Sequence, residues 1–172
     1  MANFNASLWY HLYNKPSKAD AFIGTNLNAN NGNAGAVFWE STNTTRERQR
    51  WQLYAVNETY YMLRTQAGGA NAFLGAMFSA DETTYGNTTP HMIRGSKSDE
   101  SVFWEVSPWG DGTFFITNKR NGTGWHLARK PSNGLAVMDL NTPSEPQGEQ
   151  WNFEQVGEVQ TDEFSTLNVS NF

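Results

Sequence analysis

The segment QRWQL at residues 49–53 decides the fold of this chain, because the same arrangement returns twice further along. The later copies are VFWEV at residues 102–106 and EQWNF at residues 149–153, each with a tryptophan at its centre. All three read as short strands, and the tryptophans are 53 and then 47 residues apart. Recurrence at a period near fifty residues indicates an internal repeat.

Two further strands precede each tryptophan segment at matching steps. The first strands of the three copies begin at Tyr10, Tyr61 and Phe114, which are 51 and 53 residues apart. The second strands carry apolar residues at the same two spacings: Ile23, Leu74 and Leu127. A weaker third strand follows a turn in each copy, at residues 36–39, 91–93 and 135–138. Every copy therefore supplies four short strands.

Three units of four strands predict an all-β fold of the β-trefoil type, with pseudo-threefold symmetry, in which a closed barrel is capped by hairpins. A β-propeller has repeats of similar length but needs at least four blades. No window shows a sustained apolar helical period, so only short helical turns are expected.

The predicted domain spans residues 1–156, with repeats at about 7–56, 57–109 and 110–156. Residues 157–172 form an acidic tail outside the repeat pattern. This tail either packs back on the domain through its apolar residues or is disordered; these residues are Phe164, Leu167 and Phe172.

Composition excludes several classes of function. The 172 residues carry a net charge of −5 and no cysteine, which disfavours binding to nucleic acid or anionic membranes and excludes thiolate chemistry. No apolar stretch is long enough to span a membrane, and residues 1–4 do not resemble a signal peptide, so a cytoplasmic protein is expected. The sequons would matter only if a leader had been removed; they begin at Asn5, Asn43, Asn57, Asn87, Asn121 and Asn168.

The chain resembles the ricin B-type lectin family, whose β-trefoil copies each end in a Gln-x-Trp strand. The first copy has this motif intact at residues 49–51, and residues 31–34 lead towards Trp39 and Asn43 as in that family. The resemblance covers residues 7–156 in layout and is specific in the first copy. The chain resembles the small, cysteine-free fungal members, for which the family implies a defence role.

In that family, a sugar site combines an aspartate just after the apolar core residue of the second strand, an aromatic residue of the third strand and polar residues before the Gln-x-Trp motif. The aspartate position holds Gly24, Gly75 and Ala128 here, so the main hydroxyl acceptor is absent three times. The resemblance therefore implies a galactose-type glycan site in the first copy alone, formed by Trp39, Asn43, Arg48 and Gln49.

A structural role competes with this site. Gln49 and Trp51 also suit packing between strands, and Trp39 serves as a platform only if its ring faces solvent. Trp109 stands in a turn, where it either binds a ligand or plugs the open end of the barrel.

No catalytic or cofactor motif is present. His11, His91 and His126 fall on different strands of their copies and predict no metal site, and no phosphate-binding loop or catalytic carboxylate pair is evident. We expect a non-catalytic lectin-like protein without a cofactor, and a homodimer would strengthen weak glycan binding.

Two other functions remain open. One is a β-trefoil that binds protein, as protease inhibitors do, through the long loops at residues 79–90 and 141–149. The other is a β-trefoil that has lost its sugar sites.

Overall fold

The computed structural model describes residues 2–14, 18–76, 88–96, 98–130, 133–140 and 148–167. These residues form twelve β-strands and short 3-10 turns, with no α-helix among them. The strands are β1 (Leu8–Asn14), β2 (Asp20–Gly24), β3 (Val37–Ser41), β4 (Trp51–Ala55), β5 (Tyr61–Thr65), β6 (Ala72–Gly75), β7 (His91–Arg94), β8 (Trp104–Pro108), β9 (Phe114–Asn118), β10 (Gly122–Arg129), β11 (Ala136–Leu140) and β12 (Trp151–Glu158). In the described part of the chain, no helix has the length and apolar character needed to cross a membrane.

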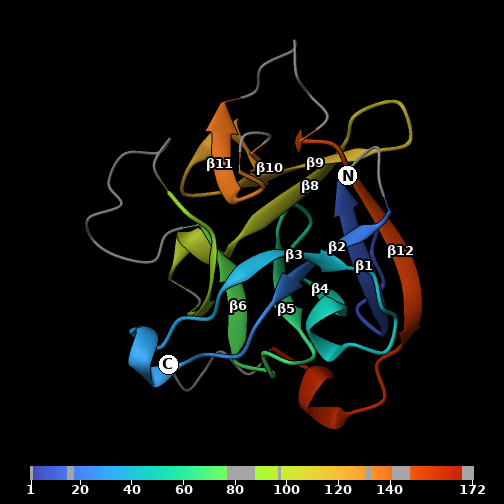
Figure 1. Ribbon diagram of the computed structural model, residues 1–172, viewed down its shortest axis with the longest axis vertical. Helices are drawn as coiled ribbons and strands as arrows, with labels where there is room; N and C mark the ends of the chain where they lie inside the picture. The colour runs from blue at the N-terminus through green and yellow to red at the C-terminus, as the bar shows by residue number, and fades with distance from the viewer. Residues whose placement is uncertain are drawn as a thin grey trace.

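Six strands close into a barrel. Antiparallel pairing runs from β1 through β4, β5, β8, β9 and β12, and β12 returns to β1. Figure 1 shows the last strand, β12 in red, beside the first strand, β1 in blue. Because each of the six strands has a partner on both sides, the barrel has no unpaired edge.

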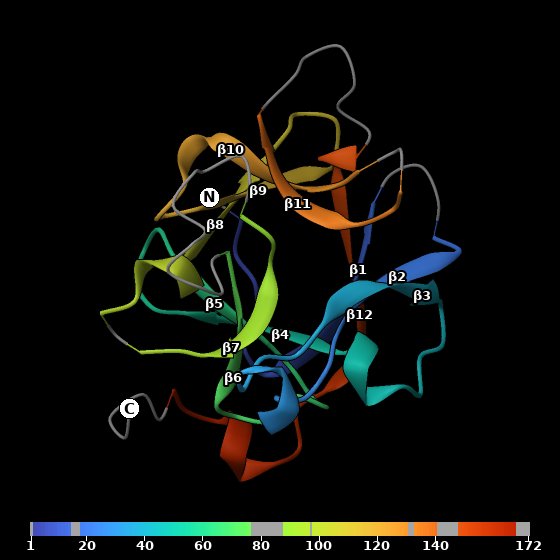
Figure 2. The same cartoon turned by 60° about the vertical axis from the view of Figure 1, so that its left-hand side comes forward.

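Three hairpins complete the fold, one from each copy. They are formed by β2 with β3, β6 with β7, and β10 with β11. Figure 2 shows these hairpins in blue, green and orange, set around the barrel. A six-stranded barrel with three such hairpins is a β-trefoil, so the predicted fold class is confirmed.

The three repeated tryptophans tie each hairpin to the barrel in the same way. All three side chains are completely buried. Their indole N–H groups donate to backbone carbonyls of the second strands: Trp51 to Phe22 at 2.8 Å, Trp104 to Leu74 at 2.7 Å and Trp151 to Leu127 at 2.8 Å. A buried indole N–H requires an acceptor, and the repeated hydrogen bond explains why tryptophan returns in every copy.

These hydrogen bonds correct the alignment of the second strands. Phe22, and not Ile23, is the structural equivalent of Leu74 and Leu127. Both Phe22 and Ile23 are completely buried, so the apolar pattern does not distinguish them. The correction places Trp39, which pairs with Phe22, at the position of two buried methionines: Met92 and Met138.

The N-terminal segment closes one end of the barrel. The ring of Phe4 lies among four aromatic rings at centroid distances of 4.6 to 5.8 Å, those of Tyr10, Tyr61, Phe114 and Phe153. Three of these rings occupy the equivalent first-strand position of the three copies. Phe4, and not Trp109, therefore plugs the barrel.

The chain continues past β12 with a short 3-10 turn, Asp162–Phe164. Phe164 is buried and Leu167 packs on a small cluster that contains Phe73 and Phe103. The tail thus packs back on the domain through two of its predicted apolar residues; Phe172 lies outside the described residues.

Candidate ligand-binding site

Two of the polar residues predicted to bind a sugar in the first copy, Arg48 and Gln49, are held by Glu40 of β3. Arg48 and Gln49 donate to Glu40 Oε1 at 2.9 and 2.8 Å, and Arg46 donates to Oε2 at 2.9 Å. Arg48 also donates to Oε2. Gln49 is completely buried, and its side-chain amide N–H also donates to the Ser41 carbonyl at 2.9 Å.

The Glu40 carboxylate is saturated by these contacts. An ionised carboxylate offers about four acceptor positions, and four protein donors occupy them. Burial alone raises the pKa of Glu40, but hydrogen bonds from Arg48 and Gln49 and the two arginine charges hold it below its usual range. The same ion pair raises the pKa of Arg48.

Asn43 and Trp39 are similarly engaged. The Asn43 side chain accepts from the backbone and hydroxyl of Thr45, and its backbone N–H donates to Gln49. Trp39 packs on Phe22 at a centroid distance of 4.9 Å, and the Arg129 guanidinium lies over its ring at 5.0 Å. The structure brings the four predicted residues into one region, but their contacts serve packing and turn formation. A sugar role for them stays a prediction.

A better-formed cavity lies elsewhere, between β8, β9 and the start of β10. Its volume is about 430 Å³. Its lining combines three aromatic rings with carboxylate and hydroxyl groups: Glu105, Ser107, Trp109, Phe115, Thr117, Thr123 and His126. Pockets of this size that mix aromatic walls with a few polar groups are typical sites for small ligands.

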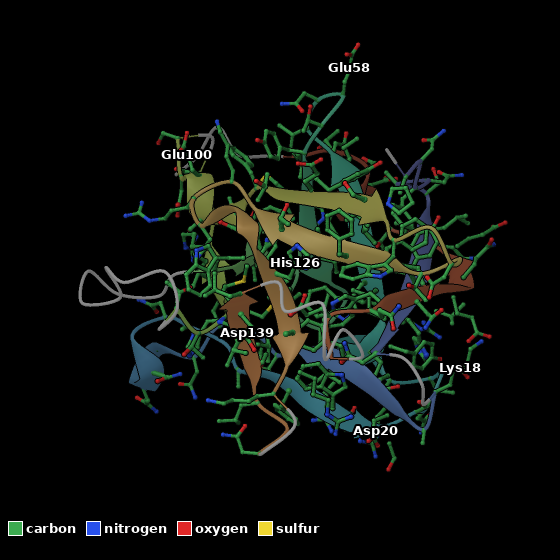
Figure 3. The ribbon with its side chains drawn as sticks, turned by 90° about the horizontal axis from the view of Figure 1, so that it is seen from above. Lys18, Asp20, Glu58, Glu100, His126 and Asp139 are labelled. Carbon is green, nitrogen blue, oxygen red and sulfur yellow. The ribbon has the colours of Figure 1, made fainter. Side chains whose placement is uncertain are left out.

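The aromatic rings form a corner. Phe115 and His126 stack at 4.9 Å with only 15° between their planes. Trp109 stands nearly perpendicular to both, at 83° and 85°, with centroid distances of 5.4 and 5.7 Å. Figure 3 shows His126 among the strands, well inside the outline of the molecule, whereas Glu58 and Lys18 lie at its rim.

His126 is fixed by a buried partner. Its Nδ1 lies 2.7 Å from Glu149 Oε2, and both residues are 2% exposed. This buried hydrogen bond sets the orientation of the ring. Glu149 occupies the position that Gln49 has in the first copy, two residues before the core tryptophan. The third copy thus has a glutamate where the first copy has a glutamine, and this glutamate is the partner of His126.

A tight turn between β8 and β9 holds Trp109. The Trp109 N–H donates to the Thr113 carbonyl at 2.8 Å, and the Asp111 side chain accepts from the Thr113 N–H at 3.0 Å. Gly110 and Gly112 have φ values of 101° and 89°, in the region that favours glycine. Trp109 is therefore presented on a well-defined turn.

A small residue in β9 leaves the cavity open. Thr117 pairs across the barrel strands with Glu105, as Arg64 pairs with Gln52 in the preceding copy and Tyr13 pairs with Asn152 in the next. These three positions are equivalent under the pseudo-symmetry. Threonine has a smaller side chain than arginine or tyrosine, so it leaves more room at this position.

Sequence reasoning identified Trp109 only as an aromatic residue in a turn and His126 only as an isolated histidine. The cavity draws on three strands, so no local motif contains it. The available signal was the contrast at one repeat position: Arg64, Thr117 and Tyr13. Within the described ranges, no group of three metal-ligating side chains comes together.

No protein-family model matches the chain, and no curated protein matches it. Solved structures do share its fold. The β-trefoil BEL, in an apo crystal form, superposes with a TM-score of 0.65 at 14% identity, covering 89% of this chain and 96% of that chain. The Polyporus squamosus lectin bound to Neu5Acα2-6Galβ1-4GlcNAc has a TM-score of 0.66 at 15% identity, covering 89% of this chain and 50% of the lectin.

A third similar structure belongs to a longer enzyme. It is the endo-β-galactosidase from Clostridium perfringens that releases GlcNAcα1-4Gal, with a TM-score of 0.62, 14% identity and coverage of 87% of this chain and 32% of the enzyme. The chain thus spans about half of that lectin and a third of that enzyme. At these identities the likeness shows the fold: the protein is a β-trefoil, a fold that occurs in lectins and within enzymes.

Proposed function

We propose that this protein is a non-catalytic carbohydrate-binding β-trefoil whose ligand occupies the cavity between β8, β9 and β10. The observation that carries this proposal is the aromatic corner, which lies beside a carboxylate and three hydroxyl groups in one open cavity. Lectins among the proteins of the same fold, and the resemblance to the ricin B-type family, support it.

The lining suits both faces of a sugar. The apolar C–H face of a pyranose ring packs on an aromatic side chain, and Trp109 offers such a surface at the cavity. Sugar hydroxyls pair with carboxylate and hydroxyl oxygens, which Glu105, Ser107 and Thr123 supply. The Ser107 hydroxyl donates to Glu105 Oε1 at 3.1 Å, so the carboxylate is oriented before a ligand arrives.

The experiment is a glycan-array screen of the purified protein, followed by calorimetric titration of the best ligand. Trp109→Ala should weaken binding about tenfold or more because it removes the stacking surface. Thr117→Tyr should block the cavity, and the fold tolerates tyrosine at this position, as Tyr13 shows in another copy. A thermal melt establishes that each variant is folded.

Trp39→Met is the matched control. Methionine occupies the equivalent buried position in both other copies, so the core accepts it. Retained binding in Trp39→Met together with loss in Trp109→Ala supports the cavity. The opposite result would place the site in the first copy, at Trp39, Asn43, Arg48 and Gln49. An array without any bound glycan would reject carbohydrate binding and favour a protein-binding β-trefoil, whose predicted loops fall largely outside the described residues.

A further inference from the structure

The cavity lies at one of three pseudo-equivalent positions on the side of the barrel, which we call grooves. Each groove lies where the fourth strand of one copy meets the first and second strands of the next. Their equivalence is defined by the cross-strand pairs Gln52 with Arg64, Glu105 with Thr117, and Asn152 with Tyr13. The three grooves can therefore be compared position by position.

In the first groove, the chain supplies its own cation. The Arg64 guanidinium is completely buried and lies over three aromatic rings, those of Tyr54, Phe73 and Phe164, at 5.7, 5.9 and 4.9 Å. Its Nε donates to Gln52 Oε1 at 2.6 Å. Gln52, which occupies the strand position of Glu105, thus accepts a hydrogen bond from a cation that lies on aromatic rings.

Beside Tyr13, at the third of these positions, a cation lies at the surface, with 65% of the Lys18 side chain exposed. Lys18 Nζ lies 5.9 Å from the centroid of the Tyr13 ring and 3.2 Å from Glu154 Oε2. Glu154 occupies the position that Ser107 has in the open cavity. Two of the three grooves therefore combine an aromatic ring, a cation from the chain itself and an oxygen acceptor.

The open cavity also has aromatic rings and an acceptor, but no lysine or arginine is among the described residues that line it. Thr117 replaces the arginine, and Glu105 replaces the neutral Gln52, so the acceptor carries a full negative charge. Among the described residues, the side-chain partner of Glu105 is the neutral hydroxyl of Ser107. Lys119, two residues beyond Thr117, pairs instead with Glu100 at 3.0 Å.

We infer that the ligand supplies the missing cation, and that the cavity selects glycans carrying a free amino group, such as 2-amino-2-deoxyhexose units, over neutral and N-acetylated ones. A protonated amine placed within the corner of Trp109, Phe115 and His126 would face the π surfaces and reach Glu105. The protein's net charge of −5 favours the approach of such a ligand. This inference rests on the proposed function and specifies its ligand class.

The test compares chemically matched ligands. Oligomers of glucosamine and of N-acetylglucosamine, at equal length, are titrated against the wild-type protein at low and high salt. We expect the amino oligomer to bind about tenfold more tightly, and the preference to shrink as salt screens the charge.

Two variants use residues that the other copies already hold at these positions. Glu105→Gln keeps an oxygen acceptor at this position but removes its charge, so it should weaken binding of the amino oligomer more than binding of the N-acetylated one. Thr117→Arg restores the internal cation beside Glu105 and should abolish binding of the amino oligomer, with no loss in thermal stability.

The outcomes separate the two proposals. Equal binding of amino and N-acetylated oligomers, both lost in Trp109→Ala, would overturn the amino preference and leave carbohydrate binding intact. A preference that survives in Glu105→Gln would also overturn it. Binding of N-acetyl-arginine amide in the absence of any glycan binding would overturn both proposals and indicate that the cavity receives a basic side chain of a protein.

Discussion

Residues that occupy one repeat position have diverged according to their local partners. Two residues before the core tryptophans, the copies carry Gln49, Val102 and Glu149. Gln49 joins β3 to the turn before β4, Val102 packs in a small apolar cluster, and Glu149 orients His126. The position is buried in every copy, so the three side chains differ because their neighbours differ and not because their exposure differs.

His11 provides a residue-scale prediction on pH. Its Nε2 is buried without a hydrogen-bond partner in the described structure, and burial lowers its pKa, opposed by Glu154 and reinforced by Arg50. Below about pH 6.5, His11 binds a proton more readily in the unfolded chain than in the folded protein. This residue therefore makes the protein less stable as the pH falls.

His11→Phe should reduce that pH dependence, because phenylalanine does not titrate and is accepted at the equivalent position, Phe115. The measurement is urea unfolding of both proteins at pH 7.5 and pH 5.5. The loss of stability on acidification should be smaller in the variant. Identical losses in the two proteins would show that folded His11 is protonated as readily as in the unfolded chain.

At the scale of elements, the segment after β12 acts as part of the core. Arg64 donates to the carbonyls of Phe164 and Thr166 at 2.8 and 3.0 Å. Burial lowers the pKa of Arg64 to about 10, so the guanidinium stays charged at neutral pH. Phe164 also packs edge-on against Trp9 at 4.9 Å. This contact network makes residues 159–167 a cover for the first groove.

Phe164→Ala should lower the free energy of unfolding by about 3 kcal/mol, since it removes a buried ring and uncovers Arg64. Urea denaturation followed by tryptophan fluorescence measures the change. Thr161→Ala is the control, because Thr161 is exposed and its side chain caps nothing. Equal midpoints for Phe164→Ala and wild type would mean that the segment is not docked in solution.

At the scale of the whole molecule, stability depends on closing the barrel at both ends. The hairpins cover one end, and the N-terminal segment fills the other through Phe4. The Tyr61 hydroxyl donates to the Ala2 carbonyl at 2.5 Å, and the Asn5 N–H donates to the Tyr10 hydroxyl at 3.1 Å. Phe4 is therefore a single plug for all three copies and has no counterpart in the repeat.

Phe4→Ala should destabilise the protein by about 2 kcal/mol, because a half-buried ring in contact with four others is lost. The thermal unfolding midpoint should fall by several degrees, whereas Asn3→Ala, at an exposed residue, should leave it unchanged. A midpoint that does not move in Phe4→Ala would show that the barrel is closed without this ring. The glycan binding proposed for the cavity should persist in both variants, because neither Phe4 nor Asn3 is among its lining residues.

The sequence by itself determined the repeat, the four strands of each copy and the β-trefoil, because core tryptophans and aromatic strand starts must recur wherever three copies build one barrel. It also led to the prediction of a lectin-like site, placed by the one intact motif at residues 49–51. In the structure Gln49 of that motif is buried against Glu40, and a sugar role at this place stays a prediction.

Only the tertiary structure decided the register of β2 and the composition of the cavity. Phe22 and Ile23 are both apolar and buried, so their order in the repeat followed from hydrogen bonds to Trp51 and not from hydrophobicity. Glu105, Thr117 and His126 meet because β8, β9 and β10 pair as neighbours in the closed barrel and its hairpin. Arg64, Thr117 and Tyr13 differ in side-chain volume, and the pairing of the strands is what makes their positions equivalent.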